Sequence, residues 1–210
     1  MITVSLIDTM GHDLTVVNSA RVSFGKHKEV LDDGDIKLIN YLGKHRHISP
    51  FGHNFATFSV TAPVFVARQL VKHKFLRWNE ISRRYVDDPP TFFTPDAYRS
   101  IAPDKKQGSG GAIQDTKAIE AKVDGLHKGA ARTYRRLLEL GVCEEQARMV
   151  LPQSMMTSWY WSGSLDAWAD MVNLRLKPDA QYETQIVAAR ISEFMDEMFP
   201  NAWRALVDET

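Results

Sequence analysis

The sequence contains one cysteine, Cys143, among 210 residues. A single thiol cannot form an internal disulfide and cannot alone supply a cysteine-based zinc site, so we expect no metal centre. It suits a reducing compartment, and we expect a cytoplasmic protein. The simplest structural interpretation of Cys143 is a small, buried apolar side chain.

The sequence also has no excess of charge of either sign, because 26 Lys and Arg residues balance 26 Asp and Glu residues. No overall field therefore attracts nucleic acid or an acidic membrane surface. No apolar run approaches the ~20 residues of a membrane-spanning helix. The N-terminal stretch MITVSLIDTMGHDL lacks a basic segment and is interrupted by acidic residues, so we do not expect a signal peptide. We predict that neither nucleic acid nor a membrane is a partner.

Hydrophobic spacing predicts a helix-rich α+β protein. Residues 1–7 and 54–62 alternate between apolar and polar side chains as half-buried strands do, whereas residues 14–24 fit either a strand or a helix. Helical signals cover the ranges 32–43, 63–73, 115–140, 144–150, a Trp- and Met-rich stretch up to 175, and 179–198. We expect Trp159, Trp161 and Trp168 in the core. We predict that residues 1–210 form a single domain whose mainly antiparallel sheet comes from the first ~90 residues, with a flexible surface loop at 103–115.

Basic side chains are concentrated in one segment, VARQLVKHKFLRWNEISRRYV, residues 66–86. If residues 63–73 form a helix, one face is apolar and the opposite arc carries Arg68, Gln69, Lys72 and His73. A solvated face is the commonest explanation of such a charge run, but a merely soluble helix would more often carry Glu for pairing at i,i+4. Hydroxyl and guanidinium groups follow directly at residues 77–85. Because these groups suit phosphate oxygens, the segment predicts a nucleotide or dinucleotide ligand.

Two residues of this segment have alternative interpretations. Ser82 could be a nucleophile, but no adjacent base and no G-x-S-x-G turn accompany it, so we favour a hydrogen bond to substrate. His73 could be structural, as a lone helical histidine usually is, or it could donate to an anion because it lies among cations.

The segment KHKFLRWNEIS, residues 72–82, has the form basic-His-basic, seven residues, then Ser. It resembles the Arg-His-Arg-x7-Ser signature of flavin-dependent thymidylate synthases. Other stretches that resemble blocks of this family lie along the chain in the same order: SARVSF (19–24), HISPFGH (47–53), APVFVARQ (62–69), EEQARMVLP (144–152), NLR (173–175) and DAQYETQ (179–185). The resemblance spans nearly the whole chain, and it implies the fold of that family.

The resemblance also implies roles for individual residues. It places FAD against Ser23, His47, Ser49, Lys72, His73, Lys74, Glu80, Ser164 and Asp170. It places dUMP against Arg68, Gln69, Lys72, Glu80, Ser82, Arg83, Arg84, Arg148 and Arg175. Arg175 and Ser82 are the implied catalytic residues, and Arg175 matches the arginine that lies against the uracil and helps to ionise it.

The implied reaction is the reductive methylation of dUMP to dTMP, with 5,10-methylenetetrahydrofolate as carbon donor and NADPH as the reductant of FAD. The family forms homotetramers whose active sites are shared between subunits. This route needs no enzyme thiol, in agreement with the interpretation of Cys143 as a structural residue. A cation at the pyrimidine edge would instead stabilise developing negative charge, and the flavin would supply reducing equivalents.

Several positions depart from the family pattern. Lys72 and Lys74 stand where arginine is usual, which replaces bidentate forks with point charges. Ser164, Asp166 and Asp170 stand where Asn, Arg and Asn are common, and Asp179 stands where His is common. Because carboxylates beside an anionic cofactor are unfavourable, we predict weaker or differently held FAD. The alternative function is a flavin- or nucleotide-binding homologue with weak or no turnover.

Overall fold

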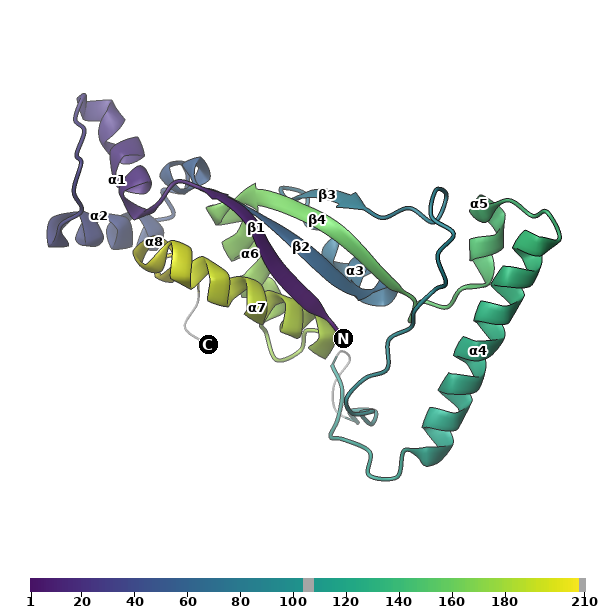
Figure 1. The fold of residues 1–210 in the computed structure, drawn as a ribbon. Coiled ribbons are helices and arrows are strands. Elements are labelled where there is room, and N and C mark those ends of the chain that lie inside the picture. Colours follow the sequence, from purple (N-terminus) through teal and green to yellow (C-terminus); the bar gives the residue numbers. More distant parts are fainter. Residues whose placement is uncertain (104–107, 208–210) are drawn as a thin grey trace.

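The computed structural model describes residues 1–103 and 108–207 (Figure 1). The predicted loop at 103–115 therefore falls partly outside the described residues, at 104–107. The remainder forms an antiparallel sheet, helices that cover one of its faces, a helical end and a helical arm (Figure 1).

The sheet has four strands in the order β1-β2-β4-β3, and every neighbouring pair is antiparallel. The strands are β1 (Thr3–Met10), β2 (Phe55–Pro63), β3 (Arg77–Glu80) and β4 (Met156–Ser164). The strands predicted near the N-terminus and at 54–62 are thus confirmed, as is the α+β class. Apolar and polar side chains alternate along β2, so that Phe58 and Val60 are buried while Ser59 between them is only half-buried. One face of this strand therefore packs into the core.

The predicted helix up to residue 175 is wrong for residues 156–164, which form β4. Trp159 and Trp161 are 2% and 0% exposed, whereas Tyr160 between them is 54% exposed. This period of two is that of a strand, and Trp and Tyr fit a pleated, half-buried surface. The sheet therefore does not come from the first ~90 residues alone, because β4 lies between β2 and the unpredicted edge strand β3.

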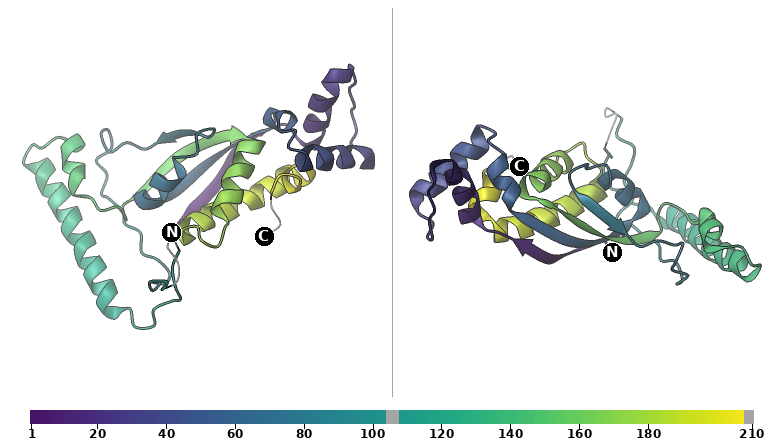
Figure 2. Two further views of the ribbon diagram at one scale, coloured as in Figure 1. Left: turned by 180° about the vertical axis from the view of Figure 1, so that it is seen from behind. Right: turned by 90° about the horizontal axis from the view of Figure 1, so that it is seen from above.

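Three helices pack on one face of the sheet: α3 (Val64–Leu70), α6 (Leu165–Arg175) and α7 (Tyr182–Met198) (Figure 2). The core joins them through aromatic contacts. The Trp168 ring of α6 meets Phe58 edge-on at 5.1 Å between centroids and Trp161 at 5.0 Å. The three tryptophans predicted in the core are indeed buried.

α3 is shorter than the predicted helix at 63–73, since it ends at Leu70. The chain must reverse there because Arg77 already pairs with Ser162 of β4. Leu76 is buried against Gly163, where an added Cβ would lie 2.2 Å from the Leu76 side chain. Lys72 and His73 therefore lie in a turn and not on a helix face.

One end of the sheet carries α1 (Asp13–Arg21), a 3-10 turn (Val22–Phe24), α2 (Asp33–Lys44), a second 3-10 turn (Ser49–His53) and α8 (Pro200–Arg204). The ambiguous stretch 14–24 is thus helical. The predicted helix at 32–43 is confirmed, with Asp32 as its N-cap. Asp13 is buried and accepts hydrogen bonds from the backbone N–H groups of Asn201 and Ala202, which joins α1 to α8.

The opposite end of the molecule carries an arm made of α4 (Lys117–Glu139), α5 (Glu144–Ala147) and a 3-10 turn (Arg148–Val150). Figures 1 and 2 show this arm standing away from the sheet. The helices predicted at 115–140 and 144–150 are confirmed in outline. The expectation of a buried Cys143 is wrong: the residue is exposed at the N-cap of α5.

Candidate functional site

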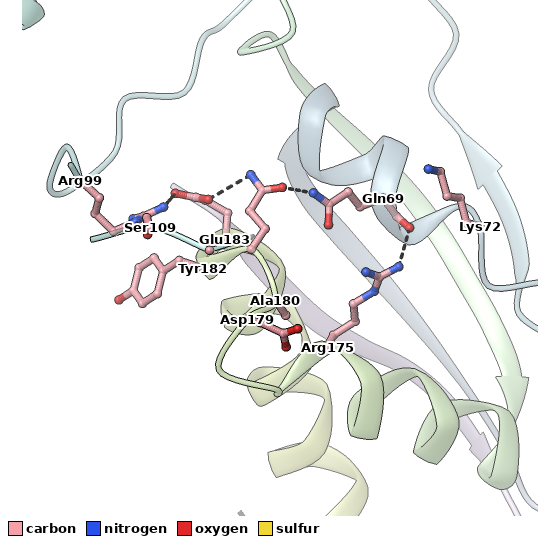
Figure 3. A pocket seen from close by; sticks show the side chains of 11 residues that line it. Gln69, Lys72, Arg99, Ser109, Arg175, Asp179, Ala180, Tyr182 and Glu183 are labelled. Atoms are coloured by element: carbon pink, nitrogen blue, oxygen red, sulfur yellow. Dashed lines mark hydrogen bonds and ion pairs between the residues drawn. The ribbon is translucent and has the colours of Figure 1, made fainter. Parts of the chain in front are cut away.

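A first pocket of about 490 Å³ lies between the C-terminal end of α3, the end of α6 and the start of α7 (Figure 3). It is lined by Gln69, Lys72, Arg99, Gly108, Ser109, Arg175, Asp179, Ala180, Gln181, Tyr182 and Glu183. Three residues predicted to bind dUMP meet here: Gln69 and Lys72 at and just after the end of α3, and Arg175 at the end of α6.

Arg175 is the last residue of α6, and two hydrogen bonds fix its guanidinium. Nε donates to Nε2 of His73 at 3.0 Å, and Nη2 donates to the backbone carbonyl of Gln69 at 3.1 Å. Burial, and then the positive charge of Arg175, lower the pKa of His73 to about 4. Burial also lowers the pKa of Arg175, which nevertheless stays cationic. His73 is thus a neutral acceptor that holds Arg175, which supports the structural interpretation of this histidine.

Three other lining residues form a hydrogen-bonded chain that ends on Gln69. Arg99 Nη2 donates to Glu183 Oε1 at 2.5 Å, and Gln181 Nε2 donates to Glu183 Oε2 at 3.1 Å. Gln69 Nε2 in turn donates to Gln181 Oε1. Arg99, Gln181 and Glu183 are not among the residues predicted from the sequence to bind a ligand. Gln181 and Glu183 lie in the block DAQYETQ (179–185), which resembles the family and could have pointed to them. Nothing in this block indicates that Glu183 is buried.

A second pocket of about 580 Å³ lies on the other side of α3, against β4 and the base of the arm. Its lining includes four more residues of the predicted dUMP set: Arg68, Glu80, Arg83 and Arg148. Glu80 Oε1 accepts from Thr157 Oγ1 at 2.7 Å, and Glu80 Oε2 accepts from Trp78 Nε1 at 3.1 Å. These bonds hold the carboxylate at the pocket wall.

Ser82 and Arg84 lie beside this second pocket in the segment after β3. The hydroxyl of Ser82 accepts from the backbone N–H of Arg84 at 3.3 Å, and no base capable of activating it contacts it among the described residues. Arg84 Nε lies 2.9 Å from Glu145 Oε2 at the base of the arm. This arrangement is consistent with a hydroxyl that binds a ligand and does not act as a nucleophile.

The structure therefore divides the predicted dUMP residues between two pockets. Arg68 and Gln69 are neighbours in sequence, yet they line different pockets because successive residues of a helix point about 100° apart. Neither of these two pockets gathers all the predicted dUMP residues.

Six of the nine residues predicted to bind FAD lie at the helical end of the sheet, whereas Lys72 and His73 lie at the first pocket and Glu80 lies at the second. Ser164, the N-cap of α6, pairs with Phe55 of β2, and Ser49 opens the 3-10 turn that precedes this strand. Asp170 of α6 lies 3.5 Å from the guanidinium of Arg46. His47, Ser23 and Lys74 are exposed on the neighbouring segments.

This donor set fits an anionic, hydrogen-bonding cofactor such as FAD, because hydroxyl, imidazole and cationic groups are exposed together. Asp166 is half-buried, and its Oδ1 is enclosed by protein with no hydrogen-bond partner among the described residues.

No group of three or more His, Cys, Asp or Glu side chains gathers as metal ligands within residues 1–103 and 108–207. In the same part of the chain, no helix combines the length and apolar character needed to cross a membrane.

The family of the chain follows from comparison with known proteins. The profile of the family described as "Thymidylate synthase complementing protein" matches residues 5–201, and the chain belongs to this family. Relatives in Thermus thermophilus and Thermotoga neapolitana are named flavin-dependent thymidylate synthase. The first is 43% identical over 202 residues, which is 96% of this chain and 74% of the relative, and the second is 38% identical over 209 residues, or 97% and 90%. The family predicted from the sequence is confirmed.

Solved structures share the fold. The UMP/dUMP methylase PolB from Streptomyces cacaoi, bound with 5-Br dUMP, superposes with a TM-score of 0.90 at 34% identity over 98% of this chain and 94% of that one. The same protein bound with 5-Br UMP superposes with a TM-score of 0.86 at 33% identity, over 98% and 93%.

Proposed function

We propose that the protein catalyses the reductive methylation of dUMP to dTMP, with FAD as cofactor, 5,10-methylenetetrahydrofolate as carbon donor and NADPH as reductant. The observation that carries this proposal is the family match over residues 5–201, together with the pocket that brings Gln69 and Arg175 side by side. Names of relatives and the dUMP methylase neighbour support the substrate and the cofactor.

In this proposal Arg175 binds the uracil base. Its guanidinium is immobilised by His73 and the backbone of Gln69 before any substrate arrives. A fixed cation next to a pyrimidine carbonyl stabilises negative charge that develops on the ring, without a cost of reorganisation at that moment. Arg83, Arg84, Arg148 and Ser82 supply groups suited to the phosphate.

FAD supplies the reducing equivalents, and the residues proposed to hold it are Ser23, His47, Ser49, Lys72, His73, Lys74, Glu80, Ser164 and Asp170. Ser23, His47, Ser49, Lys74 and Ser164 would contribute hydroxyl, imidazole and ammonium donors at one end of the sheet, while Lys72 and His73 lie at the first pocket and Glu80 at the second. No thiol is required, and Cys143 does not line either pocket as the structure describes them.

We further propose a homotetramer with shared active sites. Two features support this proposal: the dUMP residues are divided between two pockets, and the arm exposes the large apolar side chains of Leu126, Leu140 and Met149. A second subunit could bring the complementary half-site to each pocket. The proposed compartment is the cytoplasm, where a lone free thiol stays reduced.

The direct test is to assay the purified protein for dTMP with dUMP, methylenetetrahydrofolate, NADPH and FAD, omitting each component in turn. We expect product only in the complete mixture. Expression should also rescue a thymidine-requiring bacterium, and rescue should be lost in Arg175→Ala or Ser82→Ala. Rescue that survives both substitutions would contradict the site.

A homologue that binds flavin or nucleotide with weak or no turnover is the rival function, motivated by the acidic residues Asp166 and Asp170. It predicts binding of FAD and dUMP without dTMP formation in the complete mixture. A second candidate is methylation of UMP, which the likeness to a UMP/dUMP methylase favours. Parallel assays with UMP and dUMP under identical conditions separate the two substrates.

A further inference from the structure

Ser154 differs from its neighbours in the segment that lines the second pocket. Residues 151–153 and 155–158 line that pocket, whereas Ser154 lines a separate pocket of about 400 Å³ that α4 also lines. The segment therefore forms a wall between the two pockets. On the far side of this wall, the hydroxyl of Ser154 lies 2.7 Å from Nε2 of His127, a histidine of α4 that is only 8% exposed.

This wall is a short antiparallel ladder. Residues 91–93 pair with residues 154–156, with a bridge between Phe92 and Met155 and a backbone hydrogen bond of 2.8 Å on either side of it. We call these two paired segments the wall ladder. His127 contacts both of them, because its ring stacks on that of Phe92, at 4.6 Å between centroids and 11° between planes, while its Nε2 meets the serine hydroxyl of the other segment.

The arginines proposed to bind the phosphate lie shortly before the two segments of the wall ladder. Arg83 precedes the first segment, and its guanidinium donates to the backbone carbonyl of Asp88. Arg148 precedes the second segment, and its Nε donates to the backbone carbonyl of Glu145 at 3.2 Å. Both arginines line the second pocket, as do three residues of the ladder itself. The pairing in the ladder therefore sets how the two guanidinium groups lie relative to each other.

A ladder of this length needs support from outside, because a short isolated pair of strands is only marginally stable in water. His127 gives that support, since it covers an aromatic ring of one segment and forms a hydrogen bond with the other. Burial lowers the pKa of His127, so the ring that packs here is neutral. Groups that are held in place before a ligand arrives bind it more tightly, because less freedom is lost on binding.

We propose that His127 is a positioning residue of the second pocket: it clamps the wall ladder and thereby holds Arg83 and Arg148 at the spacing that a nucleotide phosphate requires. His127 does not touch the phosphate, because it lies on the other side of the wall. The proposal rests on the proposed function, since it takes the second pocket as the phosphate site of dUMP.

The experiment compares the affinities of dUMP and of deoxyuridine, which lacks the phosphate, so that their ratio reports the phosphate contacts. His127→Ala should bind dUMP about tenfold more weakly, since a displaced guanidinium loses a hydrogen bond to a charged group. Its affinity for deoxyuridine should equal that of the wild type. The KM for dUMP should rise while kcat changes little, because the phosphate is bound equally in the substrate and in the transition state.

Two variants test the hydrogen bond itself. His127→Gln should restore most of the preference for dUMP, because an amide both donates and accepts and can bond the Ser154 hydroxyl whichever partner is the donor. Ser154→Ala removes the same hydrogen bond from the ladder and should lower the ratio, although the stacking on Phe92 remains.

Two further variants give the reference values. Arg148→Ala removes a phosphate group directly, and adding His127→Ala to it should cost less than the two single losses together, because both act on the same contact. Lys128→Ala is the matched control, since Lys128 follows His127 on α4 and forms an exposed ion pair with Asp124. It should change neither affinity.

A purely structural role of His127 predicts lower thermal stability with an unchanged ratio of the dUMP and deoxyuridine affinities. That result in a folded His127→Ala, or in Ser154→Ala if His127→Ala does not fold, would overturn the proposal. So would a wild type that binds dUMP and deoxyuridine equally, because the second pocket would then hold no phosphate. A wild type that binds neither would overturn the proposed function and this proposal together.

Discussion

Arg175 and His73 are 102 residues apart in sequence, and Nε of the arginine lies 3.0 Å from Nε2 of the histidine. Because arginine can only donate, His73 accepts at Nε2 and carries its proton on Nδ1. Protonation of His73 would remove this acceptor and place two cations side by side. One of the two hydrogen bonds that hold the arginine proposed to contact the uracil therefore exists only while the histidine is neutral.

This pair predicts a pH-dependent stability. The pKa of His73 is lowered from 6.5 to about 4, so between these values the unfolded chain binds more protons than the folded chain. The free energy of unfolding should consequently fall as the pH is lowered from 6.5 toward 4, by on the order of 2 kcal/mol from this residue. Urea titrations at several pH values measure the slope, and His73→Gln should flatten it. An identical slope in the variant would contradict the assignment.

Replacing Arg175 by alanine should abolish most of the activity while leaving the fold intact. The loss of one preorganised charge at the reacting ring corresponds to about 10²–10³ in kcat. Arg204→Ala is the control, since Arg204 forms an exposed ion pair with Asp196 on the surface. Steady-state assays for dTMP compare the two, and equal activity in both variants would exclude Arg175 from catalysis.

The buried Asp13 should matter for stability and not for the reaction. It accepts from the backbone N–H groups of Asn201 and Ala202 at 3.0 and 2.9 Å, and from Nδ2 of Asn201 at 2.7 Å. Asp13→Ala leaves these donors of α8 without a partner and should cost about 3 kcal/mol, whereas Asp33→Ala on the exposed first turn of α2 should cost much less. Denaturant unfolding of both variants gives the comparison. Similar losses would show that the α8 contact contributes little.

Arg46 is the only residue other than glycine with a positive φ, 55°, among the described residues, and it forms an exposed, long ion pair with Asp170. A residue with a Cβ loses stability in the left-handed backbone conformation because of steric crowding, whereas glycine has no Cβ and adopts this conformation without that cost. Arg46→Gly should therefore be more stable than Arg46→Ala by about 1 kcal/mol, although both lose the ion pair. Thermal unfolding of the two variants measures the difference, and a more stable alanine variant would contradict it.

The sequence predicted most of the helices because their signals are local. Asp32 is an N-cap residue that predicts the start of α2, and the spacing of apolar residues over 115–140 predicts a single amphipathic helix. The failures have non-local causes. α3 ends at Leu70 because the chain must turn back so that β3 can pair with β4. β4 was predicted as a helix because the segment around Trp159 is rich in Trp and Met, which also suit a buried helix.

The candidate site could be predicted only in part for the same reason. The family resemblance pointed to Gln69 and Arg175, and the structure brings them together. Nothing local indicates that Glu183 is buried or that Arg99 pairs with it across 84 residues. The prediction that Arg68 and Gln69 both bind dUMP stays a prediction, and within this chain the two side chains line different pockets because they point in different directions from α3.

The most direct measurement is a crystal structure of the protein grown with FAD and dUMP. The account predicts the uracil ring in the 490 Å³ pocket, with the guanidinium of Arg175 at a ring carbonyl and no covalent bond to the protein. A pyrimidine bound elsewhere with this pocket empty, or one joined to the sulfur of Cys143, would contradict it.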